Sequence, residues 1–181
     1  GTTRLVREGM SEYLEIGVGK RSEVAQRTFI TLIRSSVQAA KRARVKKIVF
    51  DTSTLLFPKM KQVEESYLGS LVAQNLLMAN YEYTAYKKEK HVIQEILISG
   101  VQSAEAKEAL DRAVVVATET NKCRDLANTP GSEMTPSLLA DHAKQIMQGT
   151  GVRVTVFDKK RIEKEKMGAL LGVGRGAKHG P

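Results

Sequence analysis

The sequence predicts an α/β fold in which a mixed or largely parallel sheet is flanked by helices. Segments with the two-residue alternation of strands take turns along the chain with segments of helical periodicity, as in successive βαβ units. Leu, Ile, Val and Phe make up about a quarter of the residues, which is enough for a packed core. The longest unbroken apolar run, 113–117, is far shorter than the ~18 residues that a membrane span needs.

The first predicted elements are a strand and a helix joined by a glycine-containing turn. Alternating apolar residues over 13–18 predict the strand, and Gly17–Lys20 are expected to end it. Ser22 is a suitable N-cap for a helix whose apolar residues recur at helical spacing between 25 and 40.

The next predicted elements continue the alternation. Ile48–Phe50 is a short continuous apolar run, which is typical of a strand buried on both faces. A second helix is expected over roughly 63–79 because its apolar residues are periodic. The Tyr- and Lys-rich segment 81–90 is expected to be a loop or an edge, and 92–98 another strand.

The last third of the chain is predicted to be mainly helical. A long helix is expected over 103–126, and Asn128–Gly131 should stop it. Thr135 and the proline after it predict the start of a helix that ends near Gly149. Alternating valines over 152–156 predict a strand, and Asp158 is expected to cap a short charged helix.

The charge of the chain is basic and unevenly distributed. The 29 Lys and Arg residues exceed the 20 Asp and Glu residues, and the net charge of +9 comes mainly from residues 1–50 and 151–181. Five cations lie close together near the end of the first helix: Lys41, Arg42, Arg44, Lys46 and Lys47. They could bind phosphates, but cations at a helix C-terminus also complement the helix dipole, and we favour that interpretation. Aromatic residues are only 5% of the chain, which leaves few platforms for base stacking.

Two glycine-rich segments do not fit nucleotide-binding motifs. Gly17–Lys20 lacks the preceding glycine and the following Ser or Thr of a phosphate loop, since Leu14 and Arg21 stand there. Ser22 stands where a dinucleotide fingerprint needs glycine. Gly172–Gly176 is not expected to open a helix, so both segments are interpreted as turns or close backbone approaches.

The residue types that carry hydrolytic chemistry are scattered. Cys123 is the only cysteine, which excludes an internal disulfide and a cysteine-based zinc cluster, and we expect it to be a buried small hydrophobic residue. His91, His142 and His179 are isolated, and the pair Glu64–Glu65 lies beside a lysine on a presumed solvent face. We therefore expect no catalytic, cofactor-binding or metal-ligating residue in this chain.

Three motifs near the end of the chain carry a resemblance to a known family. They are Arg124–Pro130 (RDLANTP), Met134–Pro136 (MTP) and Met167–Gly176 (MGALLGVGRG), in this order. The series resembles the junction between the two domains of the leucyl aminopeptidase (cytosol aminopeptidase) family. Ile16–Lys20 is similar to the strand and turn before the first helix of that family's N-terminal domain, and the resemblance is strongest over 121–176.

The resemblance implies a division of the chain into three parts. Residues 1–102 would be a macro-domain-like N-terminal α/β domain that lacks its first strands. Residues 103–134 would be a linker helix and loop, and residues 135–181 the first elements of a truncated C-terminal peptidase domain. The first residues have no apolar segment of a signal peptide. The chain has no initiating Met, so we expect its natural start to lie upstream.

The resemblance also implies the chemistry of the intact protein. Family members release N-terminal amino acids from peptides with two divalent metal ions, zinc or manganese, held in the C-terminal domain that this chain does not include. The implied role of this segment is structural: it would pack against its own peptidase domain and support a cytoplasmic homo-oligomer, a hexamer, with no membrane contact. We expect the isolated segment to be inactive and to hold no cofactor.

Two other functions stay open on the sequence. The basic N-terminal region could make the chain a nucleic-acid-binding module, with weak DNA binding as the expected behaviour. A macro-domain-like fold could also bind a nucleotide derivative, an interpretation that depends on fold analogy alone.

Overall fold

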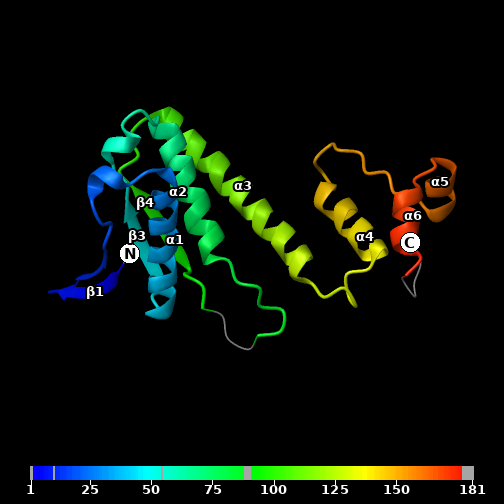
Figure 1. Ribbon diagram of the computed structural model, residues 1–181, viewed down its shortest axis with the longest axis horizontal. Helices are drawn as coiled ribbons and strands as arrows, with labels where there is room; N and C mark the ends of the chain where they lie inside the picture. Colours follow the sequence, from blue (N-terminus) through cyan, green and yellow to red (C-terminus); the bar gives the residue numbers. More distant parts are fainter. Residues whose placement is uncertain (1, 10, 54, 88–90, 177–181) are drawn as a thin grey trace. The chain divides into compact units, whose positions relative to one another are not determined.

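A computed structural model describes residues 2–9, 11–53, 55–87 and 91–176 of the chain. The chain divides into two compact units, Gly1–Arg124 and Asp125–Pro181 (Figure 1). Among the described residues, all strands lie in the first unit, while the second contains helices and coil. The division into the parts 1–102, 103–134 and 135–181 stays a prediction about independent folding.

The first unit begins with a β-hairpin. Strand β1 (Thr3–Glu8) pairs antiparallel with strand β2 (Ser11–Ile16). The sequence predicts only the second strand and places it two residues too late, at 13–18. The difference arises because Val18 leaves the hairpin and packs against the core. Gly17 approaches the start of the chain closely here, since a Cβ on it would lie 2.7 Å from the Thr2 hydroxyl oxygen.

Helix α1 (Gln26–Arg42) starts later than the sequence predicts. Ser22 lies inside a short 3₁₀ turn, Arg21–Glu23, so its predicted role as the N-cap of this helix is wrong. The reason is Val24, which is buried in the core in an extended conformation and delays the helix. The cap position is taken by Ala25, which has no side chain able to accept a hydrogen bond.

Two parallel strands form the second sheet. Strand β3 (Lys47–Asp51) pairs with strand β4 (Glu95–Ser99) in parallel. Ile48 and Phe50 pack against the core, but Val49 between them is 64% exposed. The prediction that this strand is buried on both faces is therefore wrong, because core packing covers only one face of the described pair.

Helix α1 and helix α2 (Glu65–Asn80) run parallel over that face. Three hydrogen bonds from α1 side chains to α2 each join residues 41 positions apart: Gln26 to Tyr67, Arg34 to Asn75 and Gln38 to Ala79. A constant offset means that the two helices advance in the same direction, and α2 is the helix that connects the parallel strands β3 and β4. The core between them includes Phe29, Ile33, Val37, Leu68, Val72 and Leu76.

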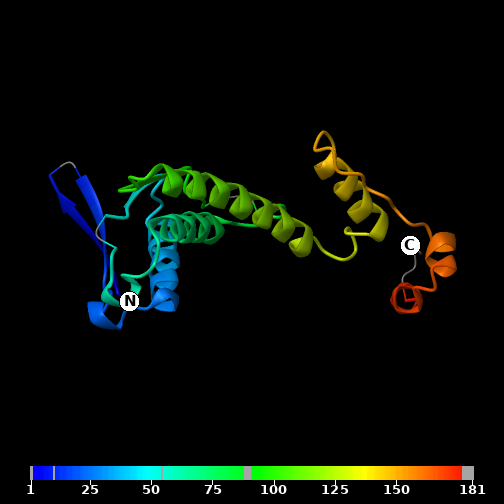
Figure 2. The same ribbon diagram turned by 90° about the horizontal axis from the view of Figure 1, so that it is seen from above.

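Helix α3 (Ala104–Asn128) lies along α2 (Figure 2). Its buried residues are all alanines: Ala106, Ala109, Ala113 and Ala117. Such small side chains let the two helices approach closely, and a Cβ on Gly69 of α2 would lie 3.6 Å from the Ala106 carbonyl oxygen. The Ser70 hydroxyl donates a hydrogen bond of 3.1 Å to the Ala109 carbonyl oxygen.

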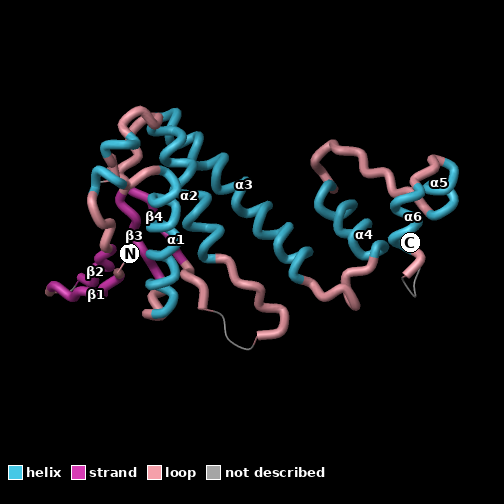
Figure 3. The backbone as a smooth tube through the Cα atoms, in the orientation of Figure 1, coloured by secondary structure: helices cyan, strands magenta, loops and turns pink. Residues whose placement is uncertain are grey.

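The second unit contains three helices within its described residues: α4 (Pro136–Met147), α5 (Lys159–Lys164) and α6 (Gly168–Gly174). The predicted strand at 152–156 is wrong, since this segment is coil (Figure 3). A strand needs a partner for its backbone hydrogen bonds, and the described part of this unit has none. The interpretation of Gly172–Gly176 as a turn holds only for Arg175 and Gly176, because α6 includes the three residues before them.

The predicted fold class is confirmed: the chain is a mixed α/β protein whose sheets include a parallel pair. The described part of segment 81–90, residues 81–87, has no helix or strand, in agreement with the predicted loop. Within the described ranges, every helix is too short or too polar to cross a bilayer.

Candidate functional site

The two ends of the first unit differ in their backbone polarity. The carboxyl ends of β3 and β4 and the N-termini of α2 and α3 meet at one end, because parallel strands and parallel helices alternate along the chain. Open α/β sheets bind ligands at the carboxyl ends of their strands, where amides and helix dipoles attract anions. A ligand site is therefore expected at this end of the unit.

Asp51 occupies the carboxyl end of β3. Its carboxylate accepts a 2.7 Å hydrogen bond from the Ser53 hydroxyl and a 3.1 Å bond from the Ser53 backbone N–H. The Ser99 hydroxyl lies 3.4 Å from the same carboxylate. These bonds, with those from Ser53 contributing most, lower the pKa of Asp51 below its usual value.

Glu65 occupies the corresponding place between α2 and α3. One carboxylate oxygen accepts a 2.9 Å hydrogen bond from the backbone N–H of Gln102, just before α3 begins. This bond and one from the Ser103 side chain lower the pKa of Glu65. Gln102 and Ser103 come directly before α3, and the Ser103 hydroxyl accepts a hydrogen bond from the Ala106 N–H, so Glu65 fixes the segment from which α3 starts.

Both carboxylates accept hydrogen bonds from backbone N–H groups that could otherwise donate to a bound phosphate. A nucleotide approaching this end would have to displace Asp51 or Glu65 and overcome their negative charge. The geometry therefore gives no support to the interpretation of the chain as a nucleotide binder.

The opposite end of the unit is organised around the C-terminus of α2. The last four carbonyl groups of a helix have no partner within it. In α2 each of the four accepts a hydrogen bond from a different side chain: Asn121 to Leu77, Arg124 to Met78, Gln38 to Ala79 and Lys41 to Asn80. The bonds come from α1 and α3, so this capped end joins all three helices.

Arg124 makes the strongest of these contacts. Its guanidinium group donates a 2.8 Å hydrogen bond to the Met78 carbonyl oxygen and a 3.0 Å bond to the Asn121 side chain. The same group lies 3.9 Å from the centre of the Tyr81 ring, in a cation–π contact. Arg124 begins the RDLANTP motif, so this motif has a structural contact in the first unit.

The predicted basic cluster lies at this end as well. Lys41 is 3.9 Å from Glu82, and Lys47 is 3.0 Å from Glu95. The other three cations, Arg42, Arg44 and Lys46, are exposed and have no ion pair with a described residue. Two of the five cations thus serve the fold, and three face solvent.

Glu82 holds the loop after α2 against this cluster. Lys87 donates a 2.9 Å hydrogen bond to one of its oxygens, and the His91 backbone N–H donates a 3.1 Å bond to the other. These bonds, together with the charges of Lys87 and Lys41, lower the pKa of Glu82. The carboxylate therefore favours its ionised form in the folded chain.

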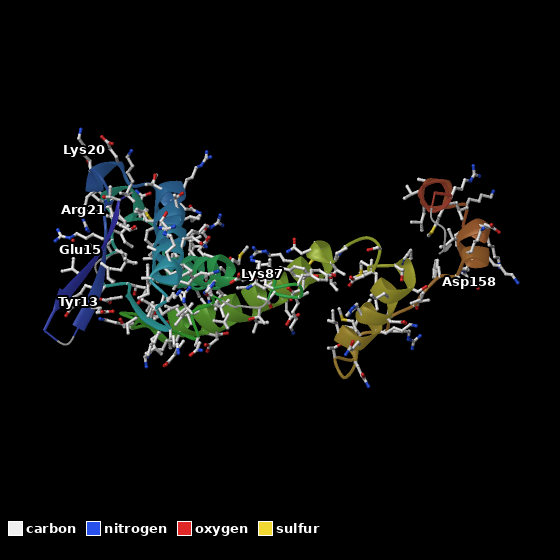
Figure 4. All side chains as sticks on the ribbon, turned by 90° about the horizontal axis from the view of Figure 1, so that it is seen from below. Tyr13, Glu15, Lys20, Arg21, Lys87 and Asp158 are labelled. Carbon is white, nitrogen blue, oxygen red and sulfur yellow. The ribbon has the colours of Figure 1, made fainter. Side chains whose placement is uncertain are left out.

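The turn Gly17–Lys20 connects β2 to the segment before α1, as its interpretation as a turn predicted. Gly19 has a φ of +70°, which a glycine adopts without strain. Lys20 lies 3.7 Å from Glu23, and Arg21 donates a hydrogen bond to the Leu56 carbonyl oxygen, so each basic side chain at this turn (Figure 4) contacts its own unit.

The scattered metal-binding residue types stay apart. His91 is exposed and His142 is half-buried, while His179 lies outside the described residues. No group of three or more His, Cys, Asp or Glu side chains that could hold a metal ion occurs within the described ranges. Cys123 is exposed, so the prediction that it is buried is wrong. The reason is that α3 buries only a narrow alanine stripe, and Cys123 lies beside that stripe.

Helix caps and a shallow depression characterise the second unit. The Thr135 hydroxyl accepts a 3.3 Å bond from the Leu138 N–H, and Asp158 (Figure 4) accepts a 2.8 Å bond from the Arg161 N–H, as the sequence predicted for both caps. A depression of about 380 Å³ lies at the end of α4. Its lining contains Lys144 and Arg153 but no carboxylate, histidine or cysteine, which are the side chains that bind zinc in proteins.

Comparison with known families decides what kind of protein these units come from. A sequence model of the N-terminal domain of the cytosol aminopeptidase family matches residues 2–90. A model of that family's catalytic domain matches residues 121–181. The chain belongs to the cytosol aminopeptidase family. The resemblance stated from the sequence motifs is thereby confirmed.

Individual relatives agree with this assignment. A probable cytosol aminopeptidase of Bdellovibrio bacteriovorus is 30% identical over 179 residues, covering 96% of this chain and 35% of the relative. One of Aquifex aeolicus is 28% identical over 166 residues, covering 90% of this chain and 32% of the relative. The chain thus spans about a third of the length of these curated relatives.

Solved structures share the fold. A tomato leucine aminopeptidase mutant matches with a TM-score of 0.81 and 23% identity, covering 100% of this chain and 36% of that chain. The bottromycin maturation enzyme BotP, in complex with Mn, matches with a TM-score of 0.80 and 21% identity, covering 99% of this chain and 37% of that chain. At these identities the likeness concerns the fold alone.

Proposed function

We propose that this chain is the N-terminal portion of a metal-dependent leucyl aminopeptidase, a cytoplasmic enzyme that removes N-terminal amino acids from peptides. The observation that carries the proposal is the order of the two family matches: the N-terminal domain comes first, and the catalytic domain begins at residue 121. In the intact enzyme two divalent ions, zinc or manganese, would lie in the part of the peptidase domain beyond these residues.

The role proposed for this segment is structural. Its polar contacts serve the fold: Asp51 and Glu65 fix loops and a helix start, and Arg124 ties α3 to α2. No catalytic residue is assigned to it, in line with the scattered histidines and carboxylates of the described residues. It would support a homo-oligomer, proposed as a hexamer, and pack against its own peptidase domain.

A chimera tests this proposal. Residues 1–181 replace the matching part of the Bdellovibrio relative, and release of a leucine chromogenic amide is measured with Mn²⁺ or Zn²⁺. We expect the chimera to turn over substrate, because the segment would position a complete peptidase domain. We expect residues 1–181 alone to show neither turnover nor stoichiometric metal, since isolated ligands hold these ions weakly.

Two results would contradict the proposal. Turnover by residues 1–181 above that of a mock preparation would show catalytic residues in this segment. A folded chimera without activity, beside an active Bdellovibrio relative, would refute its assignment as an exchangeable N-terminal portion.

DNA binding is the second candidate, and the observation that favours it is the exposure of Arg42, Arg44 and Lys46 without carboxylate partners among the described residues. Three phosphate contacts would give a salt slope of roughly −3, at about 0.9 log unit per contact. We expect weak binding that disappears near physiological salt. Changing the three residues to alanine should flatten the slope, whereas the same charge loss at Arg27, Lys59 and Lys61 should matter less.

A further inference from the structure

Helix α3 has an exposed face with an ordered pattern of charge. The alanine stripe faces α2, and the residues on the opposite side follow the spacing 4, 3, 4, 3, which places them on one face of a helix. They are Glu108, Arg112, Val115, Glu119 and Lys122. Val115 is 62% exposed, and the four charged side chains are each about half exposed or more.

The charges on this face are arranged so that two copies, placed antiparallel, set opposite charges against each other. Along the helix the face reads acidic, basic, apolar, acidic, basic, and in the opposite direction it reads basic, acidic, apolar, basic, acidic. We propose that this face of α3 binds the same face of a second copy of the chain, with the two helices antiparallel. Glu108 would then oppose Lys122 of the second copy, and Arg112 would oppose Glu119.

The alternative direction is unfavourable. Two parallel copies of the face would set Glu108 against Glu108 and Arg112 against Arg112, and each like-charge pair opposes association. The pattern therefore selects one orientation. An antiparallel contact also has the two-fold symmetry of the commonest homodimers, in which one patch meets itself.

Valines fill the centre of the contact. Val115 would lie on the two-fold axis and meet its own copy, and Val114 and Val116 are exposed on either side of it. Removing these exposed apolar side chains from water would lower the free energy of the complex and so favour association. The charges at both ends would fix the register.

The strength of the contact follows from its size. From Glu108 to Lys122 the face extends over about 21 Å of helix, at ~1.5 Å per residue, so it buries much less than the ~800 Å² per partner of a standard interface. Within one chain Glu108 already pairs with Arg112, and Glu119 with Lys122. Association through α3 alone should be weak and should weaken further as salt screens the charges.

Charge-reversal variants test the orientation directly. In an antiparallel pair, Arg112→Glu places the introduced glutamate opposite the native Glu119 of the second copy. Glu119→Arg places the introduced arginine opposite the native Arg112 of the second copy. Each variant alone should stay monomeric in sedimentation equilibrium at low salt, whereas the wild-type mass should rise with concentration.

A mixture of the two variants in equal amounts should associate. In the mixed pair the introduced glutamate of one variant faces the introduced arginine of the other. The native Glu119 of the first variant faces the native Arg112 of the second, so both layers of the contact regain opposite charges. Recovery of association on mixing distinguishes this pairing from a general loss of binding caused by the substitutions.

The control is a reversal in another exposed ion pair. Lys144→Glu breaks an equivalent surface ion pair with Asp141 on α4 and should leave the wild-type mass unchanged. Circular dichroism checks that every variant keeps its helix content. A wild-type chain that stays monomeric up to millimolar concentration, or a variant mixture that stays monomeric, overturns the proposal.

The α3 contact rests on different observations from the self-association proposed for the intact enzyme. The measured quantity is the mass of the chain and not peptide turnover. A negative result would therefore refute the α3 contact and leave the peptidase assignment unaffected.

Discussion

Replacing Gly100 by alanine should destabilise the first unit more than any other glycine-to-alanine change in it. Gly100 directly follows β4 and has a φ of +83°. A Cβ there would lie 2.7 Å from both the Asp51 carboxylate and the Ser53 backbone nitrogen, and 2.8 Å from the Thr52 hydroxyl oxygen. One of these neighbours is backbone, so it cannot turn aside as a flexible side chain would.

The expected loss has two parts. An alanine in the left-handed region costs roughly 1–2 kcal/mol. Forcing an extra carbon into a filled space typically costs about 1–3 kcal/mol more. The free energy of unfolding should therefore fall by about 2–5 kcal/mol, a large share of the ~5–15 kcal/mol that stabilises a typical domain.

Substitutions at two other glycines of the same unit distinguish the backbone cost from the crowding cost. Gly19 has a φ of +70° but nothing within 4 Å of an added Cβ, so Gly19→Ala should show only the backbone cost. Gly69 lies within α2, with its nearest neighbour at 3.6 Å, so Gly69→Ala should stabilise the helix by up to about 1 kcal/mol.

Urea unfolding of the wild type and the three variants measures these differences. A shift of the urea midpoint at an unchanged m-value reports a change in the free energy of unfolding. The expected order of stability is Gly69→Ala, wild type, Gly19→Ala and Gly100→Ala. If Gly100→Ala lost no more than Gly19→Ala, crowding at the end of β4 would be refuted as a source of instability.

Three further changes test the contacts described above. Because the folded pKa of Glu82 is depressed, its contribution is present above the ordinary value of 4.5 and is lost as the pH falls through the folded pKa. Glu82→Gln should therefore reduce the loss of unfolding free energy between pH 7 and pH 3, and an unchanged pH dependence would contradict the contacts of this carboxylate. Arg124→Ala should cost about 1–3 kcal/mol, because the Met78 carbonyl and the Tyr81 ring lose a partner; Arg124→Lys should recover only part of it in urea melts. Thr135→Ala should lower the stability of α4 by about 1 kcal/mol in thermal melts, while Thr135→Ser keeps the capping oxygen and should melt like the wild type.

The sequence predicted the long helices well because their apolar periodicity is a local property. Predicted limits of 63–79 and 103–126 compare with observed limits of Glu65–Asn80 and Ala104–Asn128. Capping was predictable where the cap is a single side chain, as at Thr135. It failed at Ser22, because burial of a neighbouring valine moved the start of the helix, and burial depends on the whole fold.

Strand environments were less predictable because they depend on what lies beside them. The apolar run at Ile48–Phe50 looks the same whether one face of the sheet is covered or both, and only the packing shows that Val49 is exposed. The alternating valines at 152–156 have the pattern of a strand, but no strand of the described second unit pairs with them. Alternation alone cannot supply the partner.

The contacts that organise the candidate sites were beyond the sequence for the same reason. Local spacing places Glu65 on a solvent face, yet it stabilises the start of α3 through an amide 37 residues away. Arg124 belongs to a recognisable motif, but its bond to the Met78 carbonyl joins residues 46 positions apart. No local pattern indicates such a pair.

The parallel arrangement of the helices explains where the charges of the first unit lie. Parallel helices add their dipoles, so one end of the unit attracts anions and the other attracts cations. Asp51 and Glu65 stand at the first end, and Lys41 binds the last carbonyl of α2 at the second. A nucleic acid phosphate near the basic cluster would meet the negative ends of α1 and α2 as well as the exposed cations. The basic cluster should therefore bind DNA less tightly than its charge alone indicates, which is why the salt slope, and not the net charge, is the deciding measurement.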